Sequence, residues 1–242
     1  VLAQIILPPL ATSMQETWVA EILDGASHAF AAEGASLAGG HTSIGSELTI
    51  GFTVTGLAHR HAHTLGSARA GDALILTGKI GSGTIMAAEM ENKANGDDVQ
   101  EALNWMASPR GAAARIVATH ARAMTDVTGF GLAGHAGRIA KASGLTADLV
   151  LESIPFFSGA ERLAQLGVRS SIWAENRAAV DATMPDTPQA ALLFDPQTSG
   201  GFLASVPLDL SETVLAELAQ VCVEATLIGQ MIAEGPVTLK AR

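Results

Sequence analysis

The chain has 242 residues, a formal net charge of −10 and 48% hydrophobic residues, so it can bury a substantial core. The acidic balance argues against nucleic acid as a partner, because duplex binding depends on Lys and Arg side chains that neutralise phosphates. The sequence has no run of about 18 apolar residues that could span a membrane. Its single cysteine, Cys222, predicts a protein of the reducing cytoplasm, in which Cys222 is a buried and unreactive thiol.

The first part of the chain reads as strand, helix and strand. We expect a buried strand over residues 1–7, which Pro8 ends, and a helix from Ser13, the first residue of a capping-box pattern, to about residue 33. Residues 48–54 alternate apolar and polar side chains, which is typical of a strand with one buried face.

The rest of the chain mixes the two kinds of element. Strands are predicted over 73–77, 124–127, 147–151, 202–206, 226–232 and 236–240. Helices are predicted over about 84–91, 98–107, 110–120, 131–143, 158–166 and 211–223, and residues 168–190 are expected to be irregular with one short helix. This mixture predicts α/β or α+β architecture, with a domain boundary in the His-containing segment 59–70.

A Gly-rich turn is expected at residues 37–42, which include Gly39, Gly40, His41 and Thr42. Adjacent glycines would let backbone N–H groups approach an anion without obstruction from a Cβ atom. The same residues also suit a plain tight turn between a helix and a strand, so both interpretations stay open.

A second candidate lies in residues 124–135, Met-Thr-Asp-Val-Thr-Gly-Phe-Gly-Leu-Ala-Gly-His. Asp126 falls at a predicted strand end, where a carboxylate can hold Mg²⁺ between phosphate oxygens, and Gly129 and Gly131 open the next helix. Alternatively, Asp126 caps that helix and the glycines serve packing. His135 lies one turn further on and is expected to be a structural histidine.

The third candidate is residues 195–201, Asp-Pro-Gln-Thr-Ser-Gly-Gly. The hydroxyl groups and bare backbone of this run suit an anion-binding loop. A strand-to-strand turn of the same composition would serve equally, and no chemical role is assigned to it.

Three alternating histidines, His59, His61 and His63, share one face if the segment is extended, which would allow metal binding. Neither an acidic residue nor a cysteine lies near them in the sequence. We therefore favour a solvated loop at this position.

Taken together and in this order, the three motifs resemble those of selenophosphate synthetase (selenide, water dikinase), a member of the aminoimidazole ribonucleotide synthetase-like superfamily. Residues 76–83, Leu-Thr-Gly-Lys-Ile-Gly-Ser-Gly, also resemble the family's passage from strand to helix. The resemblance implies a two-domain fold. An α/β domain over residues 1–66, incomplete here, pairs with another subunit to build a shared β-barrel, and an α+β domain covers residues 67–242.

The resemblance also implies a reaction and its site. The family converts ATP, selenide and water to selenophosphate, AMP and phosphate, as a cytoplasmic homodimer that needs Mg²⁺. By matching position, Asp126 is the Mg²⁺ ligand, and Gly40, His41 and Thr42 contact ATP that is bound mainly by the other subunit.

Two departures from the family pattern matter. The family's nucleophilic Cys or selenocysteine, an essential Lys and further metal-binding Asp residues are expected before Val1, so no catalytic residue is assigned and the chain alone is expected to be inactive. Residues 42–47 are more polar than the usual continuation, which indicates a branch fused behind a pyridine-nucleotide-disulfide-type oxidoreductase. The alternatives are a non-catalytic nucleotide-binding or dimerisation module of a fusion protein, and a related ATP-dependent kinase of the superfamily.

Overall fold

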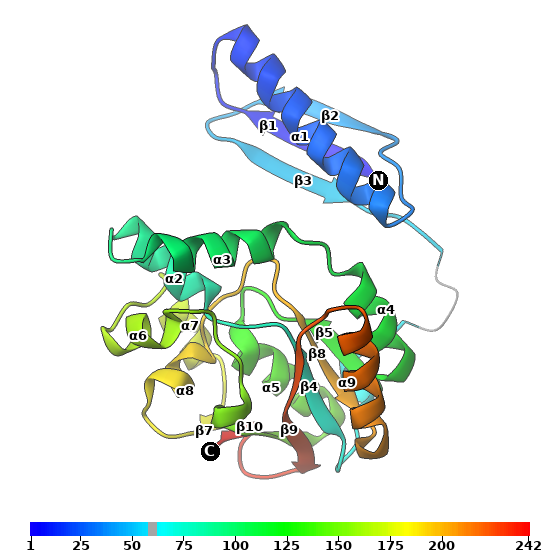
Figure 1. Cartoon of the computed structure of the whole chain (residues 1–242), viewed down its shortest axis with the longest axis vertical. Helices are drawn as coiled ribbons and strands as arrows, with labels where there is room; N and C mark the ends of the chain where they lie inside the picture. The colour runs from blue at the N-terminus through cyan, green and yellow to red at the C-terminus, as the bar shows by residue number, and fades with distance from the viewer. Residues whose placement is uncertain (58–61) are drawn as a thin grey trace. The chain divides into compact units, whose positions relative to one another are not determined.

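A computed structural model describes residues 1–57 and 62–242. The chain forms two compact units, Val1–Ala62 and His63–Arg242, and each has a sheet of its own (Figure 1). The elements of the first unit are β1 (Leu2–Leu7), α1 (Thr12–Ala32), β2 (Gly39–Ile44) and β3 (Thr49–Thr53).

The strands of residues 1–57 form a sheet in the order β2-β1-β3. β2 is parallel to β1 and is joined to it through α1, whereas β3 is antiparallel to β1. Alternation along β1 buries Ala3, Ile5 and Leu7. Phe52 of β3 lies opposite Ala3 in register, and its ring meets the α1 residue Phe30 edge to face at 5.2 Å, so α1 covers this side of the sheet.

Two expectations for this unit are wrong. Residues 39–44 form a strand rather than a turn, because they pair with β1 along its length, and Gly40 permits the approach: a Cβ there would lie 2.0 Å from the Ala3 carbonyl oxygen. The capping box is also absent. α1 begins at Thr12 with no side-chain cap, so Ser13 lies inside the helix, where its carbonyl accepts a hydrogen bond from Thr17 Oγ1.

The second unit consists of strands and helices that alternate along much of the chain, with short 3₁₀ turns between some of them. The strands are β4 (Ala73–Thr77), β5 (Ala123–Asp126), β6 (Leu145–Leu149), β7 (Ala182–Thr183), β8 (Phe202–Val206), β9 (Ala225–Ala233) and β10 (Leu239–Ala241). The helices are α2 (Ser82–Met90), α3 (Gly96–Ala107), α4 (Gly111–His120), α5 (Gly131–Ser143), α6 (Ala160–Gln165), α7 (Trp173–Ala178), α8 (Pro188–Leu192) and α9 (Ser211–Gln220).

The strands of residues 63–242, all of which the structure describes, form one mixed sheet in the order β5-β8-β4-β9-β6-β10-β7. Alternation along β4 sends Leu74 and Leu76 to a face packed with α5, and Ile75 to the opposite face, packed with α4 and α9 (Figure 1). A third apolar cluster joins α2, α3 and α6. The sheet is thus a layer between helices, because successive side chains of β4 point to opposite faces and both faces are apolar.

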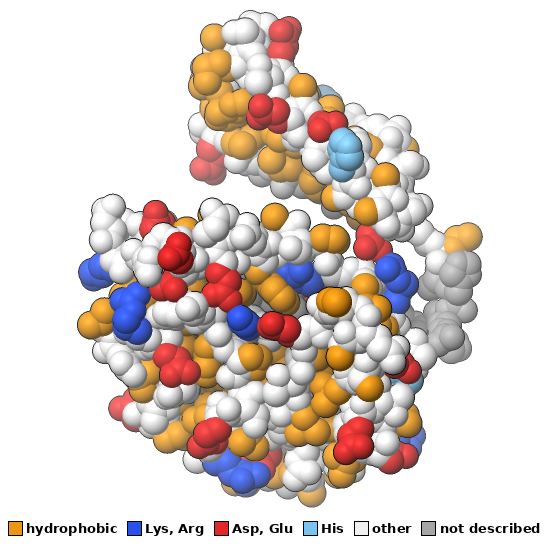
Figure 2. Space-filling model, viewed as in Figure 1, with side chains coloured by type: hydrophobic (Ala, Val, Ile, Leu, Met, Phe, Trp, Pro, Cys, Tyr) orange, Lys and Arg blue, Asp and Glu red, His pale blue; other side chains and the backbone are white. Residues whose placement is uncertain are grey.

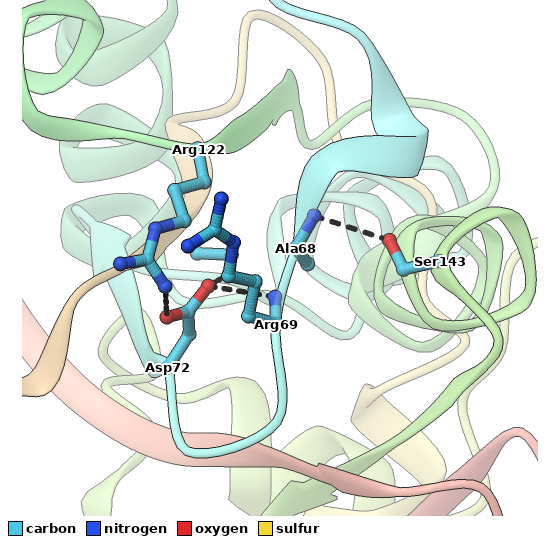
Figure 3. A network of polar contacts seen from close by, with 6 residues as sticks. Ala68, Arg69, Asp72, Arg122 and Ser143 are labelled. Atoms are coloured by element: carbon cyan, nitrogen blue, oxygen red, sulfur yellow. Dashed lines mark hydrogen bonds and ion pairs between the residues drawn. The ribbon is translucent and has the colours of Figure 1, made fainter.

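A buried carboxylate ties together the start of this sheet. Asp72, just before β4, accepts hydrogen bonds from Arg122 Nη1 at 2.6 Å, Ser205 Oγ at 2.8 Å and the Arg69 backbone N–H at 2.9 Å. Figure 3 shows the carboxylate between the guanidinium of Arg122 and the backbone of Arg69. These hydrogen bonds join the residues that precede β4 and β5 to β8, the strand that lies between them.

Two further expectations are corrected in the second unit. Residues 168–190 are more ordered than expected: they contain α7, β7 and the beginning of α8, whose N-cap Thr187 accepts a hydrogen bond from the Ala190 N–H at 3.2 Å. Cys222 is exposed rather than buried, because α9 ends at Gln220 and the chain turns there, with Cys222 at a φ of 57°.

Candidate functional site

The carboxyl ends of β4 and β5 lie at the same edge of the sheet, because both strands are antiparallel to β8, which runs between them. Residues 195–201 enter β8 at this edge. All of the second and third sequence motifs therefore meet here, together with Lys79, which follows β4.

Asp126 is the last residue of β5, and its side chain is exposed. The hydroxyl of Thr125 lies 3.0 Å from the Asp126 carbonyl oxygen and 3.4 Å from its Oδ1 atom. Among the described residues, no Lys, Arg or His side chain forms an ion pair with Asp126. The carboxylate is thus a hard oxygen ligand that is free to meet a cation.

His135, on α5, lies beside Asp126 and is 6% exposed. Its Nε2 atom lies 3.0 Å from the Thr128 backbone nitrogen, and its Nδ1 atom lies 3.4 Å from Thr125 Oγ1. The ring of Phe130 contacts the imidazole at a centroid distance of 5.7 Å. Burial lowers the pKa of His135, and the charge of Arg138 acts in the same direction against the opposing effect of Asp126.

In the third motif the side chains of Asp195 and Gln197 are built into the protein, whereas Thr198 and Ser199 are exposed. Asp195 is fully buried, and its carboxylate accepts hydrogen bonds from Thr84 Oγ1 at 2.7 Å and Gln197 Nε2 at 3.1 Å. Gln197 Oε1 in turn accepts from the backbone N–H groups of Gly81 and Ser82 at the start of α2. Burial raises the pKa of Asp195 to about 6 in spite of these hydrogen bonds.

Close backbone contacts explain why this motif has glycine at positions 200 and 201. A Cβ at Gly200 would lie 1.9 Å from the Val127 carbonyl oxygen, and one at Gly201 would lie 1.6 Å from that of Thr77. The Gly201 carbonyl accepts from the Val127 N–H at 2.8 Å. Residues 195–201 therefore join β4 and β5 by close backbone contacts, in a connection between α8 and β8 rather than the strand-to-strand turn that was considered.

A cleft of about 490 Å³ opens next to this connection, and its residues Glu101, Trp105 and Arg110 were not singled out from the sequence. Lys79 pairs with Glu101 at 2.7 Å, which raises the pKa of Lys79. Arg110 stacks at 3.6 Å over the ring of Trp105, whose Nε1 atom donates to the Ser199 carbonyl oxygen at 3.1 Å. Because these contacts join residues up to 94 positions apart, no local pattern predicted them.

Gly40, His41 and Thr42 lie on β2, in the other unit from Asp126. All three residues are exposed. A groove of about 420 Å³ between α1 and β2 is lined by these residues together with Leu23 and Leu37. The groove could accept part of a ligand.

The described residues do not complete a Mg²⁺ site around Asp126. Within residues 1–57 and 62–242, no group of three or more His, Cys, Asp or Glu side chains is arranged to hold a metal ion. His63 has its Nε2 atom 2.8 Å from the Ala118 carbonyl oxygen, while His59 and His61 lie outside the described residues. None of the helices in the described parts of the chain has the length and apolarity to cross a membrane.

Two domain families match the chain. The N-terminal domain of AIR synthase related proteins matches residues 1–58, and the C-terminal domain of the same proteins matches residues 69–242. The thiamine-monophosphate kinase of Stenotrophomonas maltophilia K279a has the same fold, with a TM-score of 0.73 at 18% identity over 99% of this chain and 70% of that one. A structure titled AaThiL complexed with AMPPCP and TMP matches with a TM-score of 0.64 at 17% identity, over 99% and 68% of the two chains.

The two-domain AIR synthase-like fold expected from the motifs is thereby confirmed. Among curated proteins, the selenide, water dikinase of Trichlorobacter lovleyi is 36% identical over 94% of this chain and 68% of its own length. Selenide, water dikinase 2 of Peptoclostridium acidaminophilum is 35% identical over 88% of this chain and 64% of its own length. The chain belongs to the selenide, water dikinase family, and it spans about two thirds of the length of these relatives.

Proposed function

We propose that this chain is a selenophosphate synthetase module. Within a longer protein that also carries the family's Cys and Lys segment, it would take part in converting ATP, selenide and water to selenophosphate, AMP and phosphate. The observation that carries the proposal is the exposed Asp126 carboxylate at the end of β5, which has no ion-pair partner among residues 1–57 and 62–242, in a chain 36% identical to a curated selenide, water dikinase.

In this proposal Asp126 supplies one oxygen ligand to Mg²⁺. When bound, the ion would neutralise charge on the phosphate oxygens of ATP. A single carboxylate fits such an ion only as part of a larger ligand set, and the described residues complete no set of three. The remaining ligands would come from outside these residues, and for this reason we expect the 242-residue chain alone to be inactive.

The first unit has its own proposed role. Gly40, His41 and Thr42 would contact ATP held mainly by a second subunit, and the exposed groove that they line supports this assignment. The N-terminal domain expected over residues 1–66 would pair with that subunit in a homodimer. The Mg²⁺-dependent dikinase reaction, the selenide substrate, the dimer and a fused oxidoreductase domain remain parts of this proposal.

The test is the Asp126→Asn substitution in the longer protein, with AMP formation measured in the presence of selenide and Mg²⁺. We expect turnover to fall at least 100-fold with an unchanged thermal midpoint, because the amide removes a charged ligand from an exposed position. Asp209→Asn, another exposed carboxylate, is the matched control and should keep wild-type turnover. Wild-type turnover by Asp126→Asn would remove Asp126 from the metal site.

The 242-residue chain alone belongs in the same assay. Turnover by this chain would contradict its expected inactivity. A longer protein that binds ATP but forms no AMP would instead favour the alternative of a non-catalytic nucleotide-binding module.

A further inference from the structure

The connection that follows Asp126 contacts His135, a histidine that has no role in the proposed chemistry. Asp126 ends β5 and α5 begins at Gly131, so the carboxylate lies on a short connection. α5 has no side-chain cap at its N-terminus. His135, in the second turn of α5, reaches back over this connection and contacts it on both sides of Asp126.

The directions of these hydrogen bonds fix the state of the ring. A backbone N–H can only donate, so the 3.0 Å contact from Thr128 requires a lone pair on His135 Nε2. The neutral ring then carries its proton on Nδ1, which faces the Thr125 hydroxyl across a longer distance of 3.4 Å. That hydroxyl donates to the Asp126 carbonyl oxygen at 3.0 Å. The chain of donors thus runs from Thr128 through His135 and Thr125 to Asp126.

Packing holds the imidazole in this orientation. The His135 residue is 6% exposed, and its ring lies against the ring of Phe130, over which the Arg138 guanidinium stacks at 3.6 Å. Other contacts fix the same connection independently: the Val127 N–H donates to Gly201 and the Thr128 carbonyl accepts from the Gln197 N–H at 3.0 Å. Only the Thr125 and Thr128 contacts depend on His135.

We propose that His135 is a positioning residue for Asp126. With its proton on Nδ1, it holds Thr125 and Thr128 so that the Asp126 carboxylate faces solvent in one orientation, ready for a divalent cation. This inference rests on the proposed role of Asp126 as a metal ligand. It also excludes His135 as a general base acting through Nε2, because that lone pair is already occupied by the Thr128 N–H.

Two isosteric substitutions separate the two contacts. Asn at position 135 places its amide near the position of Nδ1, and Gln places its amide near that of Nε2. His135→Asn should therefore lose the Thr128 contact, and His135→Gln should lose the Thr125 contact. His120→Gln is the matched control, because it removes an imidazole of α4 that pairs with Glu217 of α9.

The 242-residue chain, labelled with ¹⁵N, can be tested by NMR without any activity. We expect the Nδ1–H tautomer at His135 and a Thr128 amide that exchanges at least 10-fold faster in His135→Asn than in wild type or His135→Gln. In the longer protein, which would supply the remaining ligands, titration with Mn²⁺ alone should broaden the Asp126 amide signal, and both His135 variants should need about tenfold more Mn²⁺ for the same broadening, as is usual when the partners of a metal ligand are removed. Thermal melts exclude variants that fail to fold.

The outcomes distinguish the two proposals. An Nε2–H tautomer, wild-type Thr128 exchange in His135→Asn, or a wild-type Mn²⁺ response in both His135 variants would overturn the positioning role. If Asp126→Asn instead responds to Mn²⁺ as wild type does, while the tautomer and the Thr128 exchange are as expected, then the metal-ligand role of Asp126 fails and His135 has a purely structural role.

Discussion

At the scale of single residues, Asp195 shows how burial alone changes the chemistry of a side chain. Its carboxylate is fully buried, and the donors that reach it among the described residues are neutral groups such as Thr84 Oγ1 and Gln197 Nε2. Desolvation therefore outweighs the hydrogen bonds, and the pKa of Asp195 rises from its usual value of 3.8 to about 6.

This shift predicts a specific loss of stability with rising pH. Between pH 3.8 and 6 the folded state holds the Asp195 proton more tightly than the unfolded chain, so stability falls as pH rises through this window and levels off above it. The shift corresponds to roughly 3 kcal/mol. Denaturant unfolding of wild type and Asp195→Asn from pH 4 to 7 covers most of this window, and the difference in free energy of unfolding should move by about 2 kcal/mol in favour of Asn.

The comparison with Asp195→Asn removes the contributions of other carboxylates that titrate in the same range. In Asp195→Asn the new side-chain amide faces the Gln197 Nε2 donor, which lowers stability at every pH. It does not change how the free energy of unfolding depends on pH. Parallel pH profiles for the two proteins would contradict the raised pKa.

At the scale of elements, the start of α5 is decided by one glycine of the Thr-Gly-Phe-Gly run and not by the other. Gly131 has a φ of 70°, and a Cβ there would lie 2.7 Å from the Leu193 carbonyl oxygen. Gly129 has no neighbouring atom within 4 Å of such a Cβ. The two positions are therefore equivalent in the sequence but not in the fold.

Alanine substitutions test this difference directly. Gly131→Ala should cost about 3 kcal/mol or more in free energy of unfolding, because the left-handed backbone and the close approach to Leu193 are both disturbed. Gly129→Ala, the matched control on the same connection, should cost less than about 1 kcal/mol in urea unfolding. Equal losses would contradict the structural assignment. A stable Gly129→Ala with lost activity would place Gly129 in the site.

Local signals explain which elements were predicted. α5 ends at Ser143 before Gly144, whose φ of 64° is the left-handed conformation expected of a glycine cap, and β8 covers the expected residues 202–206. The capping box at Ser13 failed because the N-cap is Ala11, two residues earlier. Such a shift depends on how the chain leaves β1, and no nearby residue determines it.

At the scale of the whole molecule, the two units differ in how much they bury. Among residues 1–57, the buried hydrophobic side chains are Ala3, Ile5 and Leu7, and α1 has no buried residue. Larger side chains of this unit remain partly exposed, among them Leu2, Ile44, Phe52 and Val54. Figure 2 shows hydrophobic side chains on the surface of this unit. In contrast, the sheet of residues 63–242 is packed on both faces.

This contrast predicts a difference in hydrogen exchange. Amides of β1–β3 should exchange with a free energy of opening several kcal/mol below that of β4 and β8, because local stability follows buried apolar contact. If the first unit pairs with a second copy, as we propose, its protection should rise with protein concentration while that of β4 stays constant. Equal protection in both units, measured by mass spectrometry, would contradict this difference.

The sequence by itself determined the family, many of the helices and strands, and Asp126 as a candidate ligand, since each depends on residues that are close together along the chain, but it missed β2 and most of the elements in residues 168–190. The tertiary structure decided what the motifs do. Asp195 and Gln197 became buried supports, and His135 became a partner of the Asp126 turn. The cleft around Trp105 joins residues of separate helices and strands. Burial and close backbone approach arise only when distant segments pack, and no local pattern records them.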